Sequence, residues 1–461
     1  MQLLMLKFTD PRQAEPAPVF SQELGVLSAL LQAEGITSRL LLLGGYRPEQ
    51  LHQAVVRHRP QYVLVEMDPF SVTAAHRTIV DVASHYHLPV AVCGRYATCR
   101  PAEAVSVPGV EALLLGEFEQ TAVELLRAWR SGQDAAGIAG AWVQTEQGLV
   151  KGALRPPIND LDSLPRCDRE LLNCRRMVEA TGEVHFRVAR GCPHWCAYCV
   201  NDWYIDLYSP DSAEPAPGAL VRRRSPGNVM DEIAAVVPQY GEARSVAILD
   251  HCFATDEDWL ATFSQGYPRR CALPYRCHVR LNCLTERIAG MLAASNCRHV
   301  HAHVGSGSRF IREEILSMPM SSEQILAGCR TLRAAGVHVS ASAFVGCPYE
   351  SEITIEETLD LLRRAGVDEV RAKVFYPVPG SRAAELCAEN GWISGRGEEY
   401  FWLARSVLDM PSMPAGQINA VVEKFDSLLR RPDHTDLRKM LRKVRQSRKD
   451  SVLGLDGKKR K

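Results

Sequence analysis

Three cysteines within eight residues are the feature of this chain best suited to chemistry. Cys192, Cys196 and Cys199 form a C-x3-C-x2-C run directly after a short apolar segment, residues 184–189. The loop between them is short enough to bring three sulfurs to one centre. A structural zinc site and an iron–sulfur cluster held wholly by protein each take four ligands. Three thiolates therefore leave one iron of a four-iron cluster open to a small molecule.

Two other interpretations of the cysteine run stay open at this level. A zinc site completed by His194 or by a distant cysteine uses the same kinds of donor, and cysteines are also common as small buried apolar residues. An aromatic residue, Tyr198, stands just before the last cysteine, and a strand-like segment precedes the first. These flanks favour the cluster.

The elements that must position the cysteines follow a repeating strand–helix pattern. From residue 184 to about 400 six apolar runs alternate with helical patterns, and the runs cover residues 184–189, 245–249, 274–280, 299–304, 337–345 and 369–376. In a parallel barrel the reacting groups lie at the carboxyl ends of the strands. Aromatic and histidine residues near these ends serve either as proton carriers or as hydrogen-bonded wall residues: Trp195, Trp203, Tyr204, His251, His301 and His303.

A second alternation fills residues 1 to about 130. Strands are expected at residues 3–8, 38–43, 62–66, 88–93 and 110–115, with helices at 21–34, 48–58, 72–86 and 119–130. This interval predicts a Rossmann- or flavodoxin-like parallel sheet with helices on both faces. Its ligand edge would be formed by residues 9–19, 44–46, 67–71, 94–99 and 116–117. A turn-rich bridge with Pro156-Pro157 connects the two parts.

Composition limits the classes of function. The chain has 461 residues with a formal net charge of zero, which gives no basis for expecting nucleic-acid binding. Its 15 cysteines are spread without the spacing of a secreted disulfide scaffold. The apolar start is too short for a signal peptide, and no apolar run is long enough to span a membrane. We expect a cytoplasmic protein.

The cysteine run and its flanks resemble the cluster motif of the radical S-adenosylmethionine (radical SAM) superfamily, and the six repeats resemble its partial (β/α)6 barrel. The turns at residues 345–350 and 376–381 are similar to turns of that barrel. Residues 1–145, placed ahead of it, resemble the cobalamin-binding domain of cobalamin-dependent radical SAM enzymes, with Gly116-Glu-Phe-Glu119 as its characteristic turn. The chain has neither an Asp-x-His-x-x-Gly run nor a Gly-x-Gly-x-x-Gly run after the first strand. A doubly wound domain that binds nothing remains the alternative.

The resemblance implies roles for individual residues. Cys192, Cys196 and Cys199 would hold a 4Fe-4S cluster, Tyr198 would contact the adenine of S-adenosylmethionine, and Asp250 would approach its methionyl amine or act as a cap. The run His303-Val-Gly-Ser-Gly-Ser308 has Gly305 where the family has Glu. The other residues predicted to bind a cofactor are Ser306 and Ser308 in place of that Glu, Arg280 and Arg312 as ligands of the methionyl carboxylate or as structural arginines, and Gly116 and Glu117 for cobalamin. No catalytic residue is assigned.

We expect four regions: a cobalamin-binding domain (1–145), a linker (146–183), a radical SAM core (184–400) and a helical C-terminal region with a basic tail (401–461). Helices are expected at 401–408 and 415–429. The implied function is methyl transfer from S-adenosylmethionine through cobalamin to an unreactive carbon of a small molecule. The alternatives are a cobalamin-dependent cyclisation or rearrangement and a non-catalytic cobalamin or cluster protein, which the change at Gly305 keeps open. A tRNA methylthiotransferase is disfavoured, because residues 1–130 hold only Cys93 and Cys99. Flavodoxin or ferredoxin would supply electrons.

Overall fold

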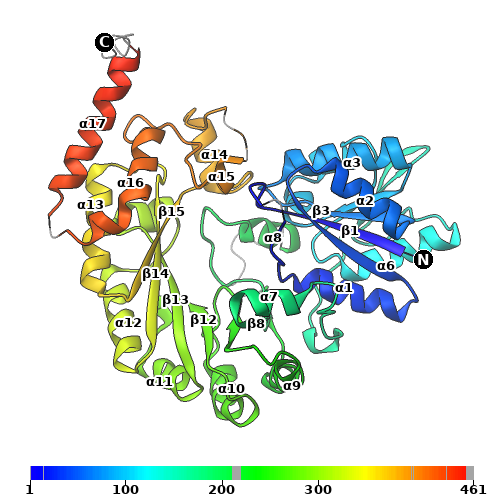
Figure 1. The fold of residues 1–461 in the computed structure, drawn as a ribbon, viewed down its shortest axis with the longest axis horizontal. Coiled ribbons are helices and arrows are strands. Elements are labelled where there is room, and N and C mark those ends of the chain that lie inside the picture. The colour runs from blue at the N-terminus through cyan, green and yellow to red at the C-terminus, as the bar shows by residue number, and fades with distance from the viewer. Residues whose placement is uncertain are drawn as a thin grey trace. The chain divides into compact units, whose positions relative to one another are not determined.

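The computed structural model describes residues 2–13, 15–209, 220–395, 397, 399–431 and 433–452 (Figure 1). The chain divides into two compact units. The first contains Met1–Pro193, Val200–Asp250 and Gly266–Pro274, and the second contains His194–Cys199, His251–Gln265 and Tyr275–Lys461. These units cut across the four regions expected from the sequence, whose boundaries stay predictions.

The first unit is built on a seven-stranded sheet with the order β2-β1-β3-β4-β5-β6-β7. Its strands are β1 (Gln2–Thr9), β2 (Thr37–Gly44), β3 (Tyr62–Glu66), β4 (Val90–Cys93), β5 (Val110–Leu114), β6 (Ala141–Thr145) and β7 (Gly148–Lys151). The first five are parallel, as predicted, whereas β6 and β7 form an antiparallel hairpin at the edge. The sequence analysis expected neither strand, with β6 at the end of the expected cobalamin-binding domain and β7 in the linker, because strands of five and four residues give little periodic signal.

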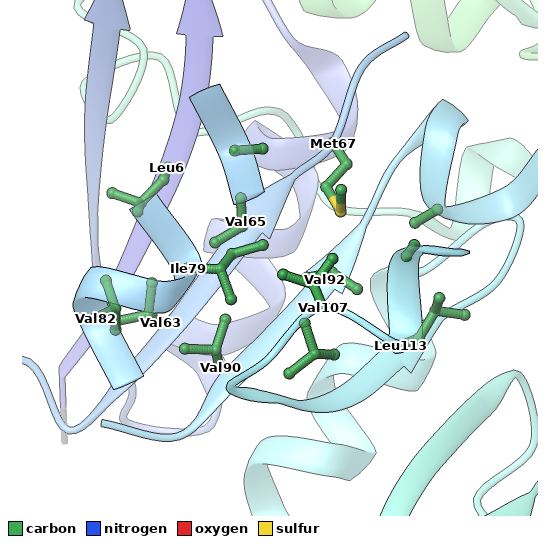
Figure 2. Packing of buried hydrophobic residues seen from close by; sticks show 14 of the residues in the cluster. Leu6, Val63, Val65, Met67, Ile79, Val82, Val90, Val92, Val107 and Leu113 are labelled. Carbon is green, nitrogen blue, oxygen red and sulfur yellow. The ribbon is translucent and has the colours of Figure 1, made fainter. Parts of the chain in front are cut away.

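Both faces of this sheet are buried, which accounts for the nearly continuous apolar strands. On one face Leu6, Val63 and Val92 pack against Ile79 of helix α3 (Val72–Tyr86), as Figure 2 shows. Leu3 and Met5 point to the other face and join the helices α1 (Gln22–Ala33) and α6 (Glu119–Ser131). Figure 1 shows α2 (Pro48–His58) and α3 on the side of the sheet opposite to α1 and α6.

The remaining part of the first unit starts the second repeat series. Strands β8 (Glu183–Phe186) and β11 (Ser245–Ile248) pair in parallel. Between them lie the short antiparallel pair β9 (Ala189–Arg190) and β10 (Arg222–Arg223) and the helices α8 (Asn201–Tyr208) and α9 (Pro226–Val236). Helix α7 (Cys174–Thr181) precedes β8.

The second unit contains four parallel strands, β12 (Tyr275–Val279), β13 (Cys297–Gly305), β14 (His338–Val345) and β15 (Glu369–Val374), paired in chain order. Helices α11 (Glu286–Ala294), α12 (Ser322–Ala334) and α13 (Glu352–Ala365) connect them. Helix α10 (Glu257–Arg270) precedes β12. The chain thus has six parallel strands in the expected succession, in two units, and the α/β fold class is confirmed.

The C-terminal region departs from the prediction at one helix. The helix expected at 401–408 is wrong: α15 covers only Glu399–Trp402, and Leu408 pairs with Ile393 in an antiparallel bridge. Ala404 has a φ of +50°, which a helix cannot accommodate. The helix at 415–429 is confirmed as α16 (Ala415–Leu429) and is followed by α17 (Thr435–Val452). The basic run 457–461 lies outside the described residues.

Within the described part of the chain, no helix is both long enough and apolar enough to cross a membrane.

Candidate functional site

The cysteine run follows β9 and leads into α8. Cys196 is buried, and Cys192 and Cys199 are half-buried. Within the second unit, the Cys199 backbone N–H donates to the Cys196 carbonyl at 2.9 Å, and the Ala197 N–H donates to Leu316 O at 3.0 Å. In the described ranges, the structure draws no three His, Cys, Asp or Glu side chains together in an arrangement that holds a metal ion. The ligand assignment of the three cysteines therefore stays a prediction.

Arg280 places a buried positive charge beside this run. It follows β12, is 7% exposed, and its Nη1 lies 3.7 Å from Cys196 Sγ. Its Nε and Nη2 are buried without a hydrogen-bond partner. A buried guanidinium with unused donors is costly unless an anion completes it. The donor set thus fits an anionic group beside the thiols, either a thiolate-held cluster or a carboxylate bound next to it.

Arg312, the other candidate for a carboxylate ligand, has its donors engaged within the protein. It lies fully buried in a π-helical turn, Phe310–Ile315. Its guanidinium donates to the carbonyls of Ser306 (2.7 Å), Gly307 (3.2 Å) and Met320, and to Ser322 Oγ at 3.2 Å. The geometry favours a structural arginine, so of the two candidates we retain Arg280.

The segment after β13 forms a tight turn whose side chains bond to each other. Ser306 Oγ lies 3.3 Å from Thr358 Oγ1 and accepts the Ser308 N–H at 3.2 Å. Gly305 has a φ of +76°, and a Cβ there would come within 2.8 Å of Met318 Sδ. The change from Glu to Gly therefore has a structural cause in this chain, because any side chain would be strained and would displace Met318. The cofactor contacts of Ser306 and Ser308 stay predictions.

Asp250, directly after β11, holds the start of the segment that leads to the cysteines. Its carboxylate accepts the Val188 N–H at 2.9 Å and the Ala189 N–H at 2.6 Å. Burial raises the pKa of Asp250 above its ordinary value, and the two N–H donors oppose that shift. The carboxylate thus positions β9, and its predicted contact with a methionyl amine stays untested.

The Gly-Glu-x-Glu turn binds the chain immediately before the cysteines. Glu117 accepts from Arg222 at 2.6 Å, from the Ile158 N–H at 2.9 Å and lies 3.2 Å from Arg190 Nη1. Glu119, fully buried, forms an ion pair with Arg190. Arg190 stands two residues before Cys192. The turn is therefore tied to the cysteine run, and direct contact of Gly116 and Glu117 with cobalamin stays a prediction.

The chain after the last cysteine returns to the same edge of the first sheet. The Glu117 N–H donates to Tyr208 Oη of α8 at 3.1 Å. Gly116, with a φ of +62°, lies so close to that hydroxyl that a Cβ would stand 1.8 Å from it. Tyr204, on the same helix, lies near Thr98 and Arg95, and burial raises its pKa. Residues 190–208, which we call the cysteine segment, are thus bound at both ends to the carboxyl edge of the first sheet.

Sequence reasoning missed both of these attachments. Arg190 immediately precedes the Gly-Cys pair, and two glutamates of a recognised turn were available to it, so a charge-pairing argument was possible. Tyr208 gave no such signal, since an eight-residue helix after the cysteines was not expected.

Tyr198 faces the second unit's sheet. Its ring packs edge-on against Phe344 at 5.0 Å and against His303 at 5.8 Å between centroids. Its hydroxyl lies 3.6 Å from Met318 Sδ. The side chain is therefore held at the carboxyl end of β13 and β14, where an adenine contact is predicted.

Glu350, in the turn after β14, makes stability depend on pH. Its carboxylate accepts the N–H groups of Gly346 and Cys347, while Oε1 is buried without a partner. Burial raises the pKa of Glu350 to about 8, against the effect of the two N–H donors. Because this folded-state pKa exceeds the unfolded value of about 4.3, the stabilisation is complete below the unfolded pKa and is lost as the pH rises through about 8.

We therefore expect the melting temperature of the parent to fall between about pH 5 and about pH 8 more steeply than that of Glu350→Gln, whose amide cannot ionise. Thermal unfolding of both proteins across this range measures the difference. Parallel profiles would show that Glu350 is not the titrating group.

Known proteins resemble this chain both in sequence and in fold. Residues 186–362 match the model of the radical SAM superfamily. The middle of the chain is a radical SAM domain. The fold is similar to those of two solved enzymes: the radical SAM methyltransferase TsrM from Kitasatospora setae, with cobalamin and a [4Fe-4S] cluster bound, superimposes with a TM-score of 0.66 over 97% of this chain and 99% of that one at 17% identity. The cobalamin-dependent radical enzyme OxsB gives a TM-score of 0.71 over 98% of this chain and 71% of that one, at 13% identity.

The curated relatives match this chain over only part of their own length. An uncharacterized methyltransferase of Pyrococcus horikoshii is 24% identical over 69% of this chain and 66% of its own length. The anaerobic magnesium-protoporphyrin IX monomethyl ester cyclase of Rubrivivax gelatinosus is 21% identical over 59% of this chain and 48% of its own length. The matched part of the chain spans from about half to just under two thirds of these relatives.

Proposed function

We propose that this protein is a cobalamin-dependent radical SAM methyltransferase that acts on a carbon of a small molecule. The single observation that carries the proposal is the attachment of both ends of the cysteine segment to the carboxyl edge of the first sheet. A ligand on a doubly wound sheet binds at that edge. The proposed cluster residues thus belong to a segment whose two ends are fixed at the edge where the second cofactor would bind, and transfer of a group between two cofactors requires such positioning.

The chain's own residues would do the binding and positioning. Cys192, Cys196 and Cys199 would hold the cluster, which would supply a binding position for S-adenosylmethionine and the electron for its cleavage. The Arg280 guanidinium would take the methionyl carboxylate, and Tyr198 would pack against the adenine. Asp250 and Arg190 would fix the segment before Cys192. Flavodoxin or ferredoxin would serve as electron donor.

Cyclisation or rearrangement with the same cofactors is the second candidate. The similarity to the anaerobic magnesium-protoporphyrin IX monomethyl ester cyclase of Rubrivivax gelatinosus supports it. The two outcomes differ in whether a methyl group leaves S-adenosylmethionine.

The carboxyl edge of the first sheet makes a prediction about cobalt. The segments at this edge, residues 9–19, 44–46, 67–71, 94–99 and 116–117, contain no histidine. We therefore expect the full-length protein to bind cobalamin with its dimethylbenzimidazole tail displaced and with no histidine on cobalt. Electron paramagnetic resonance of the bound cob(II)alamin state is the measurement, with free cob(II)alamin as the control. Nitrogen superhyperfine splitting in the protein-bound spectrum would contradict this expectation, and failure to bind cobalamin would remove the proposed function.

A further inference from the structure

The inner face of the second unit's sheet carries a ladder of alternating histidine and serine side chains. On β13, His299, His301 and His303 alternate with buried apolar residues, so all three point to the same face. On β14, Ser340 lies opposite His301 and Ser342 opposite His303 in the parallel register. Five polar groups thus line two neighbouring strands from one end to the other.

These five groups form one unbroken series of hydrogen bonds. Ser342 Oγ lies 2.9 Å from His303 Nδ1 and 3.0 Å from His301 Nε2. Ser340 Oγ lies 2.8 Å from His301 Nδ1 and 2.7 Å from His299 Nε2. Each hydroxyl bridges two imidazoles, and His301 uses both of its ring nitrogens.

The chemistry of the groups allows two ordered arrangements of the protons. A neutral imidazole has one N–H and one lone pair, and a hydroxyl can donate one bond and accept another. If every bond has one donor and all run in one direction, the three histidines either all carry the proton on Nε2 or all carry it on Nδ1. Passage of one proton from His303 towards His299 converts the second arrangement into the first.

The two ends of the series differ in their surroundings. At the carboxyl end of the strands, His303 Nε2 is buried without a partner, and the ring lies 5.8 Å from that of Tyr198. At the amino end, His299 is half-buried and packs edge-on at 5.0 Å against His338, which is exposed. One end therefore faces the side on which a parallel barrel carries out its reaction, and the other reaches solvent.

Burial, together with nearby positive charges, keeps the histidines of the ladder neutral. Burial, and next the charge of Lys373, lower the pKa of His303 to about 3 and that of His301 to about 4. Burial also lowers the pKa of His299. Other titratable groups near the ladder come from the flanking strands: Arg276 and His278 on β12, Arg280 just after β12, and Glu369, Arg371 and Lys373 on β15. Neutral imidazoles pass a proton on instead of storing it.

We propose that His303, Ser342, His301, Ser340 and His299 form a proton relay between the carboxyl end of β13 and solvent at its amino end. A proton from an acidic group of a bound molecule would move to His303 Nε2. The Nδ1 proton of His303 would pass to Ser342, and the shift would continue until His299 releases its Nδ1 proton to water. One proton enters and one leaves, and no electrons move. Reverse passage of a proton, from water at His299 Nδ1 to an acceptor at His303 Nε2, restores the starting arrangement with all three protons on Nδ1.

The use of the relay in turnover rests on the proposed function, but its existence does not. We would therefore test it on the full-length chain without cofactor or substrate. Long-range proton–nitrogen NMR on histidine labelled with nitrogen-15 reports the tautomer of each ring, with assignments from His→Gln variants. The relay predicts the same tautomer for His299, His301 and His303. A mixed set would break the single direction of the bonds and overturn the proposal.

Proton exchange with water provides the second measurement. The imidazole N–H of His303 should exchange through the relay, so Ser340→Ala and Ser342→Ala should each slow it by about a hundredfold, the lower range for a positioned proton-transfer group. The double variant should be no slower, because both changes cut the same series. Ser264→Ala, a buried serine on α10, is the matched control. Exchange as fast as in this control, or effects that multiply in the double variant, would overturn the relay.

Discussion

Replacement of Cys192, Cys196 and Cys199 by Ala together should abolish iron binding. Reconstituted without oxygen, the parent should bind about four irons per chain and show the charge-transfer absorption of a thiolate-held cluster. The variant should show neither, because thiolate ligands have no replacement on the cysteine segment. Iron analysis and absorption spectra of the two proteins provide the measurement.

A matched control for this prediction is available in the same chain. Cys167, Cys271 and Cys329 lie outside the cysteine segment, and their triple change to Ala should leave the iron content unaltered. Iron retained in the variant that lacks Cys192, Cys196 and Cys199 would contradict a cluster held by these cysteines. Stoichiometric zinc in the parent would contradict the cluster too and would favour a zinc site.

Arg280→Ala should weaken the binding of S-adenosylmethionine roughly ten- to a hundredfold. A hydrogen bond to a charged group contributes about 1.5–3 kcal/mol, and two donors of Arg280 are buried without a partner in the protein. Arg280→Lys should restore only part of the affinity, because a point charge cannot reproduce the two-pronged contact of a guanidinium. The dissociation constants of the reconstituted proteins test this.

Arg312→Ala provides the contrast, because that arginine is engaged by three carbonyls and a hydroxyl. Its loss leaves buried acceptors unpaired and should cost about 3 kcal/mol or more of unfolding free energy. If Arg280→Ala binds S-adenosylmethionine as tightly as the parent, the methionyl end lies elsewhere. If Arg312→Ala is fully stable yet binds weakly, the two roles are exchanged.

The strand–helix succession was predictable from the sequence because strands buried on both faces are continuous apolar runs. The cysteine motif was equally visible, since its spacing is local. The hairpin β6–β7 and helix α8 were not, because short elements are fixed by tertiary contacts such as that of Tyr208 with Glu117. The hydrogen bonds that Arg312 donates from its π-helical turn were not predictable either, because no pattern of charge or hydrophobicity in the sequence connects Arg312 with its acceptors.

The histidine ladder could also be predicted from the sequence only in part. The positions of His301 and His303 near a strand end were evident from the sequence. Their role was not, because a proton carrier and a hydrogen-bonded wall residue were both possible. The parallel register of β13 and β14 decides which serine meets which histidine, and a shift of one residue would turn every side chain to the other face.

The most direct test of the proposed function is analysis of what the protein makes from S-adenosylmethionine. The full-length chain, reconstituted without oxygen with iron, sulfide and cobalamin, would be supplied with S-adenosylmethionine and a reductant, and the variant without the three cluster cysteines would serve as control. Our account predicts S-adenosylhomocysteine, which records loss of the methyl group, together with 5′-deoxyadenosine, which records cleavage of the carbon–sulfur bond. Formation of 5′-deoxyadenosine alone would point to a rearrangement, and the absence of both products would contradict an enzyme of this kind.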